Sequence, residues 1–322
     1  MRLVILGAGA IGGVVGALLA RARREVVLIA RGAHLAAIRT NGLRVESPDE
    51  TFVVQPVVAE HVSDWRADDV ILLAVKTQDA AAALRELAAP PHVPIVCLTN
   101  GVEAERIALR YAREVYGGCV MLPATYLSPG VVQMWATPVP GAIDLGRYPD
   151  GSGGHADEIA GELIVAGFAC EVRTNIMKWK RGKLLSNLAN GAEALCGPAA
   201  RRSDLAERAR REARACFVEA GLSCTTEAED AARRVGFESK PIAGASRQGG
   251  STWQSLARGA STLETDYLNG EIAMLGRLHG VSTPVNEALQ GVVAEAARAR
   301  TAPGSLALEE LIARVSAFEP AR

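Results

Sequence analysis

The sequence predicts an α/β protein in which a doubly wound parallel sheet in the N-terminal half is followed by an all-helical C-terminal domain. Short apolar runs rich in Val, Ile and Leu alternate with helical stretches until about residue 173, and a glycine-rich turn follows the first run. After that point the strand signals fade and the pattern becomes helical. Alternation of this kind indicates parallel strands joined by crossover helices.

The elements can be followed in order along the chain. Strands of the sheet are expected at residues 3–6, 26–30, 70–74, 95–98 and 119–122. Residues 43–58 are expected to form a hairpin or a pair of extra strands, and 131–135 with 142–145 another antiparallel excursion. A helix at 156–165 and a strand at 168–172 precede helices at 175–190, 203–220, 225–235, 260–279, 284–300 and 306–316. The predicted domains are therefore 1–173 and 174–322.

Composition narrows the class of protein. The 322 residues suffice for two domains with sizeable cores, and 49% hydrophobic with 22% charged residues is ordinary for a globular chain. A formal net charge of −1 provides no broad basic surface, so nucleic acid is not an expected partner. Six scattered cysteines lack Cys-x-x-Cys spacing and predict free thiols in a reducing, cytoplasmic compartment, although their even number leaves disulfides open.

Residues 3–20 form an uncharged run that resembles a signal peptide or a membrane anchor. Five glycines interrupt it, and these weaken an apolar helix but suit the first strand and turn of a nucleotide-binding unit. No other long apolar run follows, so neither export nor a membrane partner is expected. The five histidines show no metal-ligand spacing, and no metal is expected.

The turn Gly7-Ala8-Gly9-Ala10-Ile11-Gly12 directly follows a strand and opens a helix. In this context Gly-x-Gly-x-x-Gly is a dinucleotide-binding signature, which predicts a Rossmann domain. The first glycine permits the tight turn, the second lets the backbone approach a pyrophosphate, and the third allows close packing of helix and strand. The alternative is a glycine-rich turn without a ligand.

The second strand is followed by Arg31, where NAD-preferring sites usually have an acid. A guanidinium can bind a 2′-phosphate through two hydrogen bonds, whereas an acid repels it. The sequence therefore predicts NADPH as the cofactor, with an ordinary surface arginine as the alternative.

A lysine and two asparagines define a polar face in the helical half. Lys183, Asn187 and Asn190 are spaced i, i+4 and i+7, which places them on one side of a helix over 175–190. Their neighbours Lys178, Lys180 and Arg181 are expected to be exposed. Asn is a modest helix former, so a ligand explains this face better than solvent does, although a solvated face remains the alternative.

Hydroxyls and an acid follow further along the chain. Ser251 and Thr252 precede Glu264, and such groups can bind a carboxylate and orient a lysine. Taken alone, the same residues serve equally well as helix caps and as a solvated acid.

Together these motifs resemble the ketopantoate reductase (2-dehydropantoate 2-reductase) family over nearly the whole chain. The shared features are the Gly7–Gly12 turn, Arg31, Ala74-Val-Lys76-Thr-Gln78, Thr99-Asn100-Gly-Val102, Lys183-Leu-Leu-Ser-Asn187 and Glu264-Thr-Asp-Tyr-Leu-Asn-Gly270. The resemblance implies a Rossmann domain joined to a helical domain similar to that of 6-phosphogluconate dehydrogenase. It also implies NADPH-dependent reduction of a 2-oxo acid, 2-dehydropantoate to pantoate in pantothenate biosynthesis, and by analogy a homodimer.

The resemblance also assigns roles to individual residues. Lys183 would be the general acid, and Glu264 would position it. Lys76, Gln78 and Asn100 would lie near the cofactor, together with Gly7, Gly9, Ala10, Ile11, Gly12 and Arg31. The substrate-binding residues would be Asn100, Asn187, Asn190, Ser251 and Thr252.

Two departures from the family pattern concern the substrate. The family commonly has an asparagine eight residues after the lysine, where this chain has Gly191, and Trp253 is unusually bulky for its place after Ser251-Thr252. Asn190 lies about 100° around a helix from position 191 and does not simply replace the missing asparagine. A different 2-oxo acid is thus an alternative substrate. A β-hydroxyacid dehydrogenase is an alternative enzyme. A non-catalytic NADP(H)-sensing protein is an alternative from another functional class.

Overall fold

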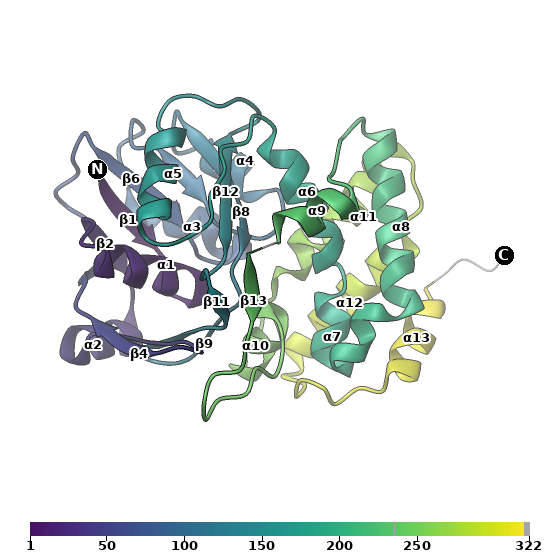
Figure 1. The fold of residues 1–322 in the computed structure, drawn as a ribbon. Helices are drawn as coiled ribbons and strands as arrows, with labels where there is room; N and C mark the ends of the chain where they lie inside the picture. The colour runs from purple at the N-terminus through teal and green to yellow at the C-terminus, as the bar shows by residue number, and fades with distance from the viewer. Residues whose placement is uncertain (235, 319–322) are drawn as a thin grey trace. The chain divides into compact units, whose positions relative to one another are not determined.

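The computed structural model describes residues 1–234 and 236–318, which form two compact units (Figure 1). The first comprises Met1–Lys180 and Thr226–Arg247, and the second comprises Arg181–Thr225 and the described residues from Gln248 onward. The predicted fold class, a parallel sheet unit and a helical unit, is confirmed. The chain passes between the units after residues 180, 225 and 247, whereas the sequence suggests one boundary at 173.

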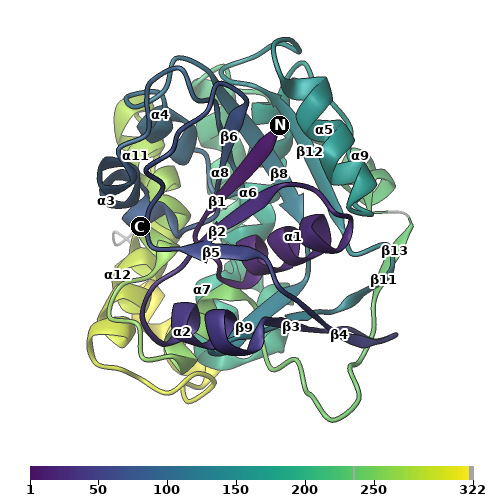
Figure 2. The same ribbon diagram turned by 90° about the vertical axis from the view of Figure 1, so that its left-hand side faces the viewer.

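A seven-stranded sheet in the order β12-β8-β7-β6-β1-β2-β5 forms the core of the first unit. Its strands are β1 (Arg2–Leu6), β2 (Val26–Ile29), β5 (Val57–Ala59), β6 (Asp69–Leu73), β7 (Ile95–Cys97), β8 (Val115–Met121) and β12 (Ala142–Arg147). Figure 2 shows β5, β2, β1 and β6 side by side; only β12, at the opposite edge, runs antiparallel to its neighbour. The strand order reverses between β1 and β6, which is the switch point where open α/β sheets bind ligands.

Both faces of this sheet are covered, as expected for parallel strands. Leu3 and Ile5 of β1 belong to one apolar cluster and Val4 and Leu6 to another, because successive side chains of a strand point to opposite faces. The first cluster includes residues of α1 (Ala10–Arg21), α2 (Gly32–Asn41) and α5 (Ala156–Val165). The second includes residues of α3 (Thr77–Leu87) and α4 (Ala104–Ala108).

A smaller sheet in the order β4-β3-β10-β9 lies beside α1. Its strands are β3 (Leu43–Glu46), β4 (Thr51–Val54), β9 (Ala124–Ser128) and β10 (Val131–Met134). The hairpin predicted within 43–58 is confirmed by β3 and β4. The joint excursion predicted for 131–135 and 142–145 is wrong, because the almost fully buried residues of β12 join the main sheet. The strand predicted at 168–172 forms only isolated bridges to Ala142 and Leu145.

Residues 226–247 form a returning segment that packs in the first unit although it follows helices of the second. It contains α9 (Glu227–Arg233) and β13 (Phe237–Ser239), and β13 pairs with β11 (Ala136–Pro138). Arg233 Nε lies 2.6 Å from Asp144 Oδ2, and the Asp144 side chain is wholly buried. This ion pair attaches the segment to β12. Residue 235 of the helix predicted at 225–235 lies outside the described residues.

The second unit is helical, as predicted. Helix α6 (Ile176–Asn187) enters it from the first unit, and it contains α7 (Asn190–Cys196), η1 (Pro198–Arg202), α8 (Asp204–Glu219), α10 (Ser251–Ala257), η2 (Glu264–Tyr267), α11 (Asn269–His279), α12 (Pro284–Arg298) and α13 (Leu308–Ser316). The helix predicted at 175–190 is in fact two, α6 and α7. Residues 260–268 form a turn and the short η2, and α10 was not predicted.

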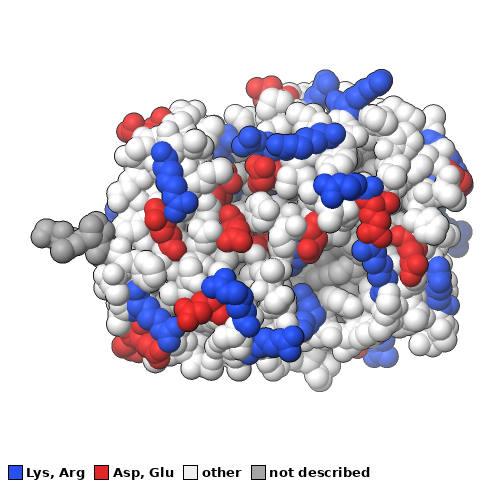
Figure 3. Space-filling view, turned by 180° about the vertical axis from the view of Figure 1, so that it is seen from behind, with Lys and Arg blue, Asp and Glu red and all other residues white. Residues whose placement is uncertain are grey.

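Basic and acidic side chains are interspersed over the face of the molecule shown in Figure 3, in keeping with the net charge of −1. The uncharged run 3–20 folds as β1, the glycine turn and most of α1. None of the helices in residues 1–234 and 236–318 is both long enough and apolar enough to span a membrane.

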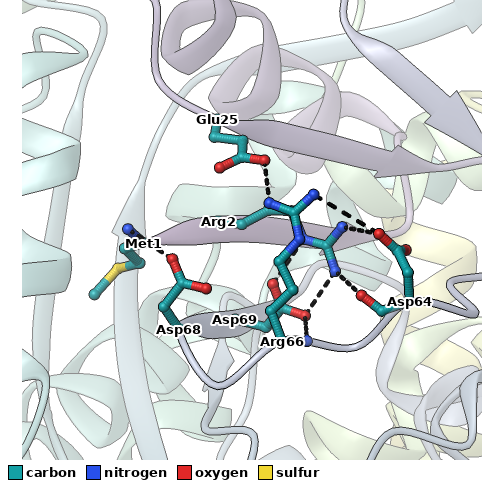
Figure 4. A network of polar contacts seen from close by, with 7 residues as sticks. All are labelled: Met1, Arg2, Glu25, Asp64, Arg66, Asp68 and Asp69. Atoms are coloured by element: carbon teal, nitrogen blue, oxygen red, sulfur yellow. Dashed lines mark hydrogen bonds and ion pairs between the residues drawn. The ribbon is translucent and has the colours of Figure 1, made fainter.

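Charged groups tie the amino ends of β1 and β6 together (Figure 4). Arg2 donates from Nε to Asp69 Oδ1 at 2.7 Å and from Nη1 to Asp64 Oδ2 at 2.9 Å. The terminal amine of Met1 lies 3.2 Å from Asp68, and this contact lowers the pKa of the Asp68 carboxyl. The network is at the end of the strands opposite to the glycine turn, so it stabilises the sheet away from the candidate site.

Candidate active site

The glycine turn joins β1 to α1 at the switch point of the sheet. Gly7 has a φ of +105°, which favours glycine, and a Cβ there would lie 2.7 Å from Val75 Cγ1. A Cβ on Gly12 would lie 2.1 Å from Gly7 O. By contrast, a Cβ on Gly9 meets no atom within 4 Å. The first and third glycines therefore permit close backbone packing, while the second leaves an open side.

The open side of Gly9 lies at the start of α1. Gly9 is the N-cap residue, it makes no side-chain cap, and the first turn of α1 carries no acid. The first backbone N–H groups of a helix lack partners within the helix, and its dipole favours an anion there. Residues 9–11 are thus suited to hold a pyrophosphate.

Arg31 follows β2 and is the N-cap residue of α2. Its Nη2 lies 2.6 Å from Oε2 of Glu86 on α3, and both side chains are more than half exposed. An exposed ion pair contributes about 0–1 kcal/mol, so a phosphate can compete with Glu86 for the guanidinium.

The loops after β6 and β7 lie next to the turn. Lys76 is the N-cap residue of α3, and Thr77 Oγ1 donates a hydrogen bond of 3.2 Å to Asn100 O. Within the described part of the chain, the buried Oε1 of Gln78 has no hydrogen-bond partner. Three of the predicted cofactor-binding segments therefore meet at the carboxyl ends of β1, β6 and β7.

Lys180 is buried, and the prediction that it is exposed is wrong. Its Nζ donates to Thr99 O at 3.1 Å and lies 2.5 Å from Glu105 Oε1. Burial raises the pKa of the Glu105 carboxyl and, strongly, that of the neighbouring Cys97 thiol. Lys180 fixes the backbone of the residue before Asn100. No local pattern marks Lys180 as buried, because its partner Glu105 is 75 positions away in the sequence.

Lys183 is partly buried on α6, and Asn187 is buried one turn later. The Nδ2 group of Asn187 finds no hydrogen-bond partner among the described residues. Helix α6 ends at Asn187, so the prediction that Asn190 continues the same helical face is wrong. A buried amide donor beside a lysine is suited to an oxygen-rich ligand.

Arg201 on η1 was not predicted as a site residue, but it contacts Asn190. It donates to Asn190 Oδ1, and its Nε donates to Glu193 Oε2 at 2.7 Å. A Cβ on Gly250 would lie 3.0 Å from that same Glu193 oxygen. The Arg201–Glu193 pair therefore lies beside the residue that precedes Ser251. Arg201 follows α7 closely in the chain, whereas α10 begins only at Ser251 and only the fold brings it to α7.

Ser251 and Thr252 begin α10, which packs against α7, and Thr252 is buried. Glu264 begins η2 and is also buried. Shortly after it, Asn269 Nδ2 donates to Leu188 O at 3.1 Å. This bond ties the chain that follows η2 to the end of α6.

The departure at Gly191 has a packing explanation. A Cβ at this position would lie 2.5 Å from Val293 Cγ2, because α12 packs closely against α7. Real Cβ atoms essentially never approach so closely. An asparagine side chain at position 191 would require the Val293 side chain or α12 to move.

Comparison with known proteins supports these observations. Family models described as Ketopantoate reductase PanE/ApbA and its C terminal match residues 3–150 and 175–297. A 2-dehydropantoate 2-reductase of Mesorhizobium japonicum is 30% identical over 323 residues, covering 91% of this chain and 97% of its own. The crystal structure of a PanE/ApbA family ketopantoate reductase from Ralstonia eutropha JMP134 is 27% identical, with a TM-score of 0.77 and coverage of 93% and 99%.

A D-mandelate dehydrogenase solved with NADH and anilino(oxo)acetate has the same fold, with a TM-score of 0.77 at 22% identity and coverage of 93% and 99%. This fold, together with relatives named 2-dehydropantoate 2-reductase, identifies a nicotinamide-dependent oxidoreductase that acts on CH–OH groups. Both units match consecutive models of one family. The chain belongs to the ketopantoate reductase family, which confirms the resemblance seen in its motifs.

Proposed function

We propose that this enzyme reduces 2-dehydropantoate to pantoate, the reaction for which its relatives are named, and that its cofactor is NADPH. The observation that carries the proposal is the buried Nδ2 group of Asn187, which lacks a partner among the described residues one turn after Lys183. A buried donor left unpaired costs about 1–3 kcal/mol, and a substrate oxygen would remove that cost. A 2-oxo acid with an additional hydroxyl offers several such oxygens.

The first unit would bind the cofactor. Gly9 has the open side that a pyrophosphate needs, and Ala10 and Ile11 begin the helix above it. Arg31 would exchange Glu86 for the 2′-phosphate, which favours NADPH over NADH. Lys76, Gln78 and Asn100 would contact the nicotinamide half, and the unpaired Gln78 Oε1 would accept a hydrogen bond there.

The second unit would bind the substrate and move the proton. Bound NADPH would supply a hydride to the keto carbon. The Lys183 ammonium would stabilise the negative charge that develops on the keto oxygen and then transfer its proton to that oxygen. Glu264 would orient Lys183. In this unit the substrate would be held by Asn187, Asn190, Ser251 and Thr252. Asn100, the remaining proposed substrate-binding residue, belongs to the first unit.

Three further assignments complete the proposal. The domain before residue 173 would be the nucleotide-binding part, with the returning segment added to it. A homodimer is proposed from family analogy alone. A cytoplasmic location fits the six cysteines, all of which are free.

The test is the loss of NADPH absorbance when the purified protein is mixed with a panel of 2-oxo acids that includes 2-dehydropantoate, with NADH in parallel. Turnover of 2-dehydropantoate with a preference for NADPH is the expected result. Reduction of another 2-oxo acid alone would overturn the substrate and make Gly191 and Trp253 the specificity determinants. Binding of NADPH without any reduction would favour the sensing protein instead.

A further inference from the structure

We infer that His34 is a positioning residue for the cofactor, because it holds the carbonyl group of Ala8 inside the glycine turn. The inference rests on the proposed binding of a pyrophosphate by that turn. His34 lies on α2, outside the Gly-x-Gly-x-x-Gly signature, and none of the motifs in the sequence includes it.

The first contact of His34 is with the turn itself. Its Nε2 lies 2.8 Å from Ala8 O. In a trans peptide the C=O and N–H groups point to opposite sides of the chain. Holding the Ala8 carbonyl toward His34 therefore directs the N–H of Gly9 to the other side of the peptide. Gly9 is the residue whose open side suits an anion.

The second contact fixes which nitrogen carries the proton. The backbone N–H of Gly130 donates to His34 Nδ1 at 2.9 Å, so Nδ1 must be unprotonated and Nε2 must be the donor to Ala8 O. Gly130 is itself held, because its carbonyl accepts a hydrogen bond of 2.9 Å from Arg44 N. The histidine thus connects the glycine turn to the β9–β10 hairpin.

The surroundings keep the imidazole rigid and neutral. The His34 side chain is buried, and the ring of Tyr126 packs on it with a centroid separation of 4.6 Å. Burial also lowers the pKa of His34, so the ring stays neutral, with Nε2 as the donor and Nδ1 as the acceptor. A fixed donor of this kind orders the turn before the cofactor binds, so binding costs less conformational entropy.

The two contacts can be separated by substitution. In His34→Gln the amide Nε2 reaches about as far as the imidazole Nε2 and can donate to Ala8 O. In His34→Asn the shorter side chain keeps an acceptor for Gly130 N–H and loses the donor to Ala8. His34→Phe keeps the ring and loses both hydrogen bonds. His155→Gln, at a histidine paired with Glu114 away from the turn, is the matched control.

The experiment measures the Kd of NADPH by fluorescence, together with kcat and KM at saturating substrate. We expect His34→Asn and His34→Phe to raise the Kd and the KM for NADPH about tenfold, with kcat at saturating NADPH unchanged. We expect His34→Gln and His155→Gln to bind NADPH like the wild type. Thermal denaturation identifies any variant that fails to fold.

The outcomes separate the inference from the proposed function. The positioning role is overturned if all folded His34 variants bind NADPH like the wild type. It is also overturned if His34→Asn binds NADPH like the wild type while His34→Gln binds it more weakly. If the wild-type protein binds neither NADPH nor NADH, the proposed cofactor site itself is overturned. An equal fall in melting temperature across the variants with unchanged Kd would show that His34 only stabilises the fold.

Discussion

Lys180 Nζ and Glu105 Oε1 lie 2.5 Å apart, with side chains that are 1% and 0% exposed. Removing one partner of a buried ion pair leaves the other charge in a medium of low polarity, whereas replacing both by apolar groups is far less costly. The Lys180–Glu105 pair is therefore a point in the fold at which one substitution has a large effect.

We predict that Lys180→Met lowers the free energy of unfolding by about 3–5 kcal/mol. The double variant Lys180→Met, Glu105→Leu should recover most of that loss, as measured by urea denaturation. Lys178→Met is the control, because its pair with Glu229 is about one-third exposed and is worth about 0–1 kcal/mol. Equal losses for the single and double variants would contradict the pairing.

Lys183→Ala should lower kcat about 10²- to 10⁴-fold while leaving the Kd of NADPH nearly unchanged, because a general acid acts on the reacting oxygen. Lys178→Ala, on the same helix, should retain turnover. Stopped-flow measurement of NADPH oxidation compares the two variants. Undiminished turnover by Lys183→Ala would remove this lysine from the mechanism.

The preference for NADPH over NADH should depend on the paired side chains of Arg31 and Glu86. Arg31→Ala should weaken NADPH binding about 10- to 100-fold, because hydrogen bonds to charged groups are strong, and it should change NADH binding little. Glu86→Gln should tighten NADPH binding, at most about fivefold, by releasing the guanidinium from an exposed pair. Titration of both cofactors tests this prediction. Equal effects on NADPH and NADH would contradict the 2′-phosphate assignment.

The lowered pKa of His34 predicts a pH dependence of stability. Its ordinary value is 6.5, so below that pH the unfolded chain binds a proton that the folded protein resists. The His34 contribution is fully present above about pH 6.5 and is lost as the pH falls toward the lower folded-state pKa. Urea denaturation at several pH values should show a shallower decline for His34→Gln. Parallel curves for the two proteins would refute the assignment.

Gly191→Ala should destabilise the protein by about 1–3 kcal/mol, because the new methyl group would clash with Val293. In a Val293→Ala background the clash disappears, and the better helix propensity of alanine should stabilise by up to about 1 kcal/mol. The change of sign between backgrounds can be measured by thermal denaturation. Destabilisation of similar size in both backgrounds would point to a different cause.

Much of the first unit could be predicted from the sequence, because its strands are short apolar runs and its turn carries a glycine signature. The predictions failed where distant contacts decide the structure. Residues 142–147 pair with β8, and all but Arg147 are buried, whereas a short apolar run does not show which strand it will join. Helix α6 ends at Asn187, although the polar spacing continues to Asn190.

The candidate site was predictable to the extent that its residues lie in local motifs. The turn, Lys183 and Glu264 belong to such motifs. Lys180 appeared to be a solvated lysine, because its partner Glu105 is 75 positions away. His34 has the same property, since its partners Ala8 and Gly130 are 26 and 96 positions away.

The returning segment also limits how the gene can be divided. A polypeptide that ends at Lys180 would contain Asp144 but lack Arg233, and β11 would lose its partner β13. Asp144 would then keep its contact with Arg173 but lose the closer one with Arg233, and the open edge of β11 would favour self-association. A shuffled or fused version of the first unit must therefore carry residues 226–247 with it.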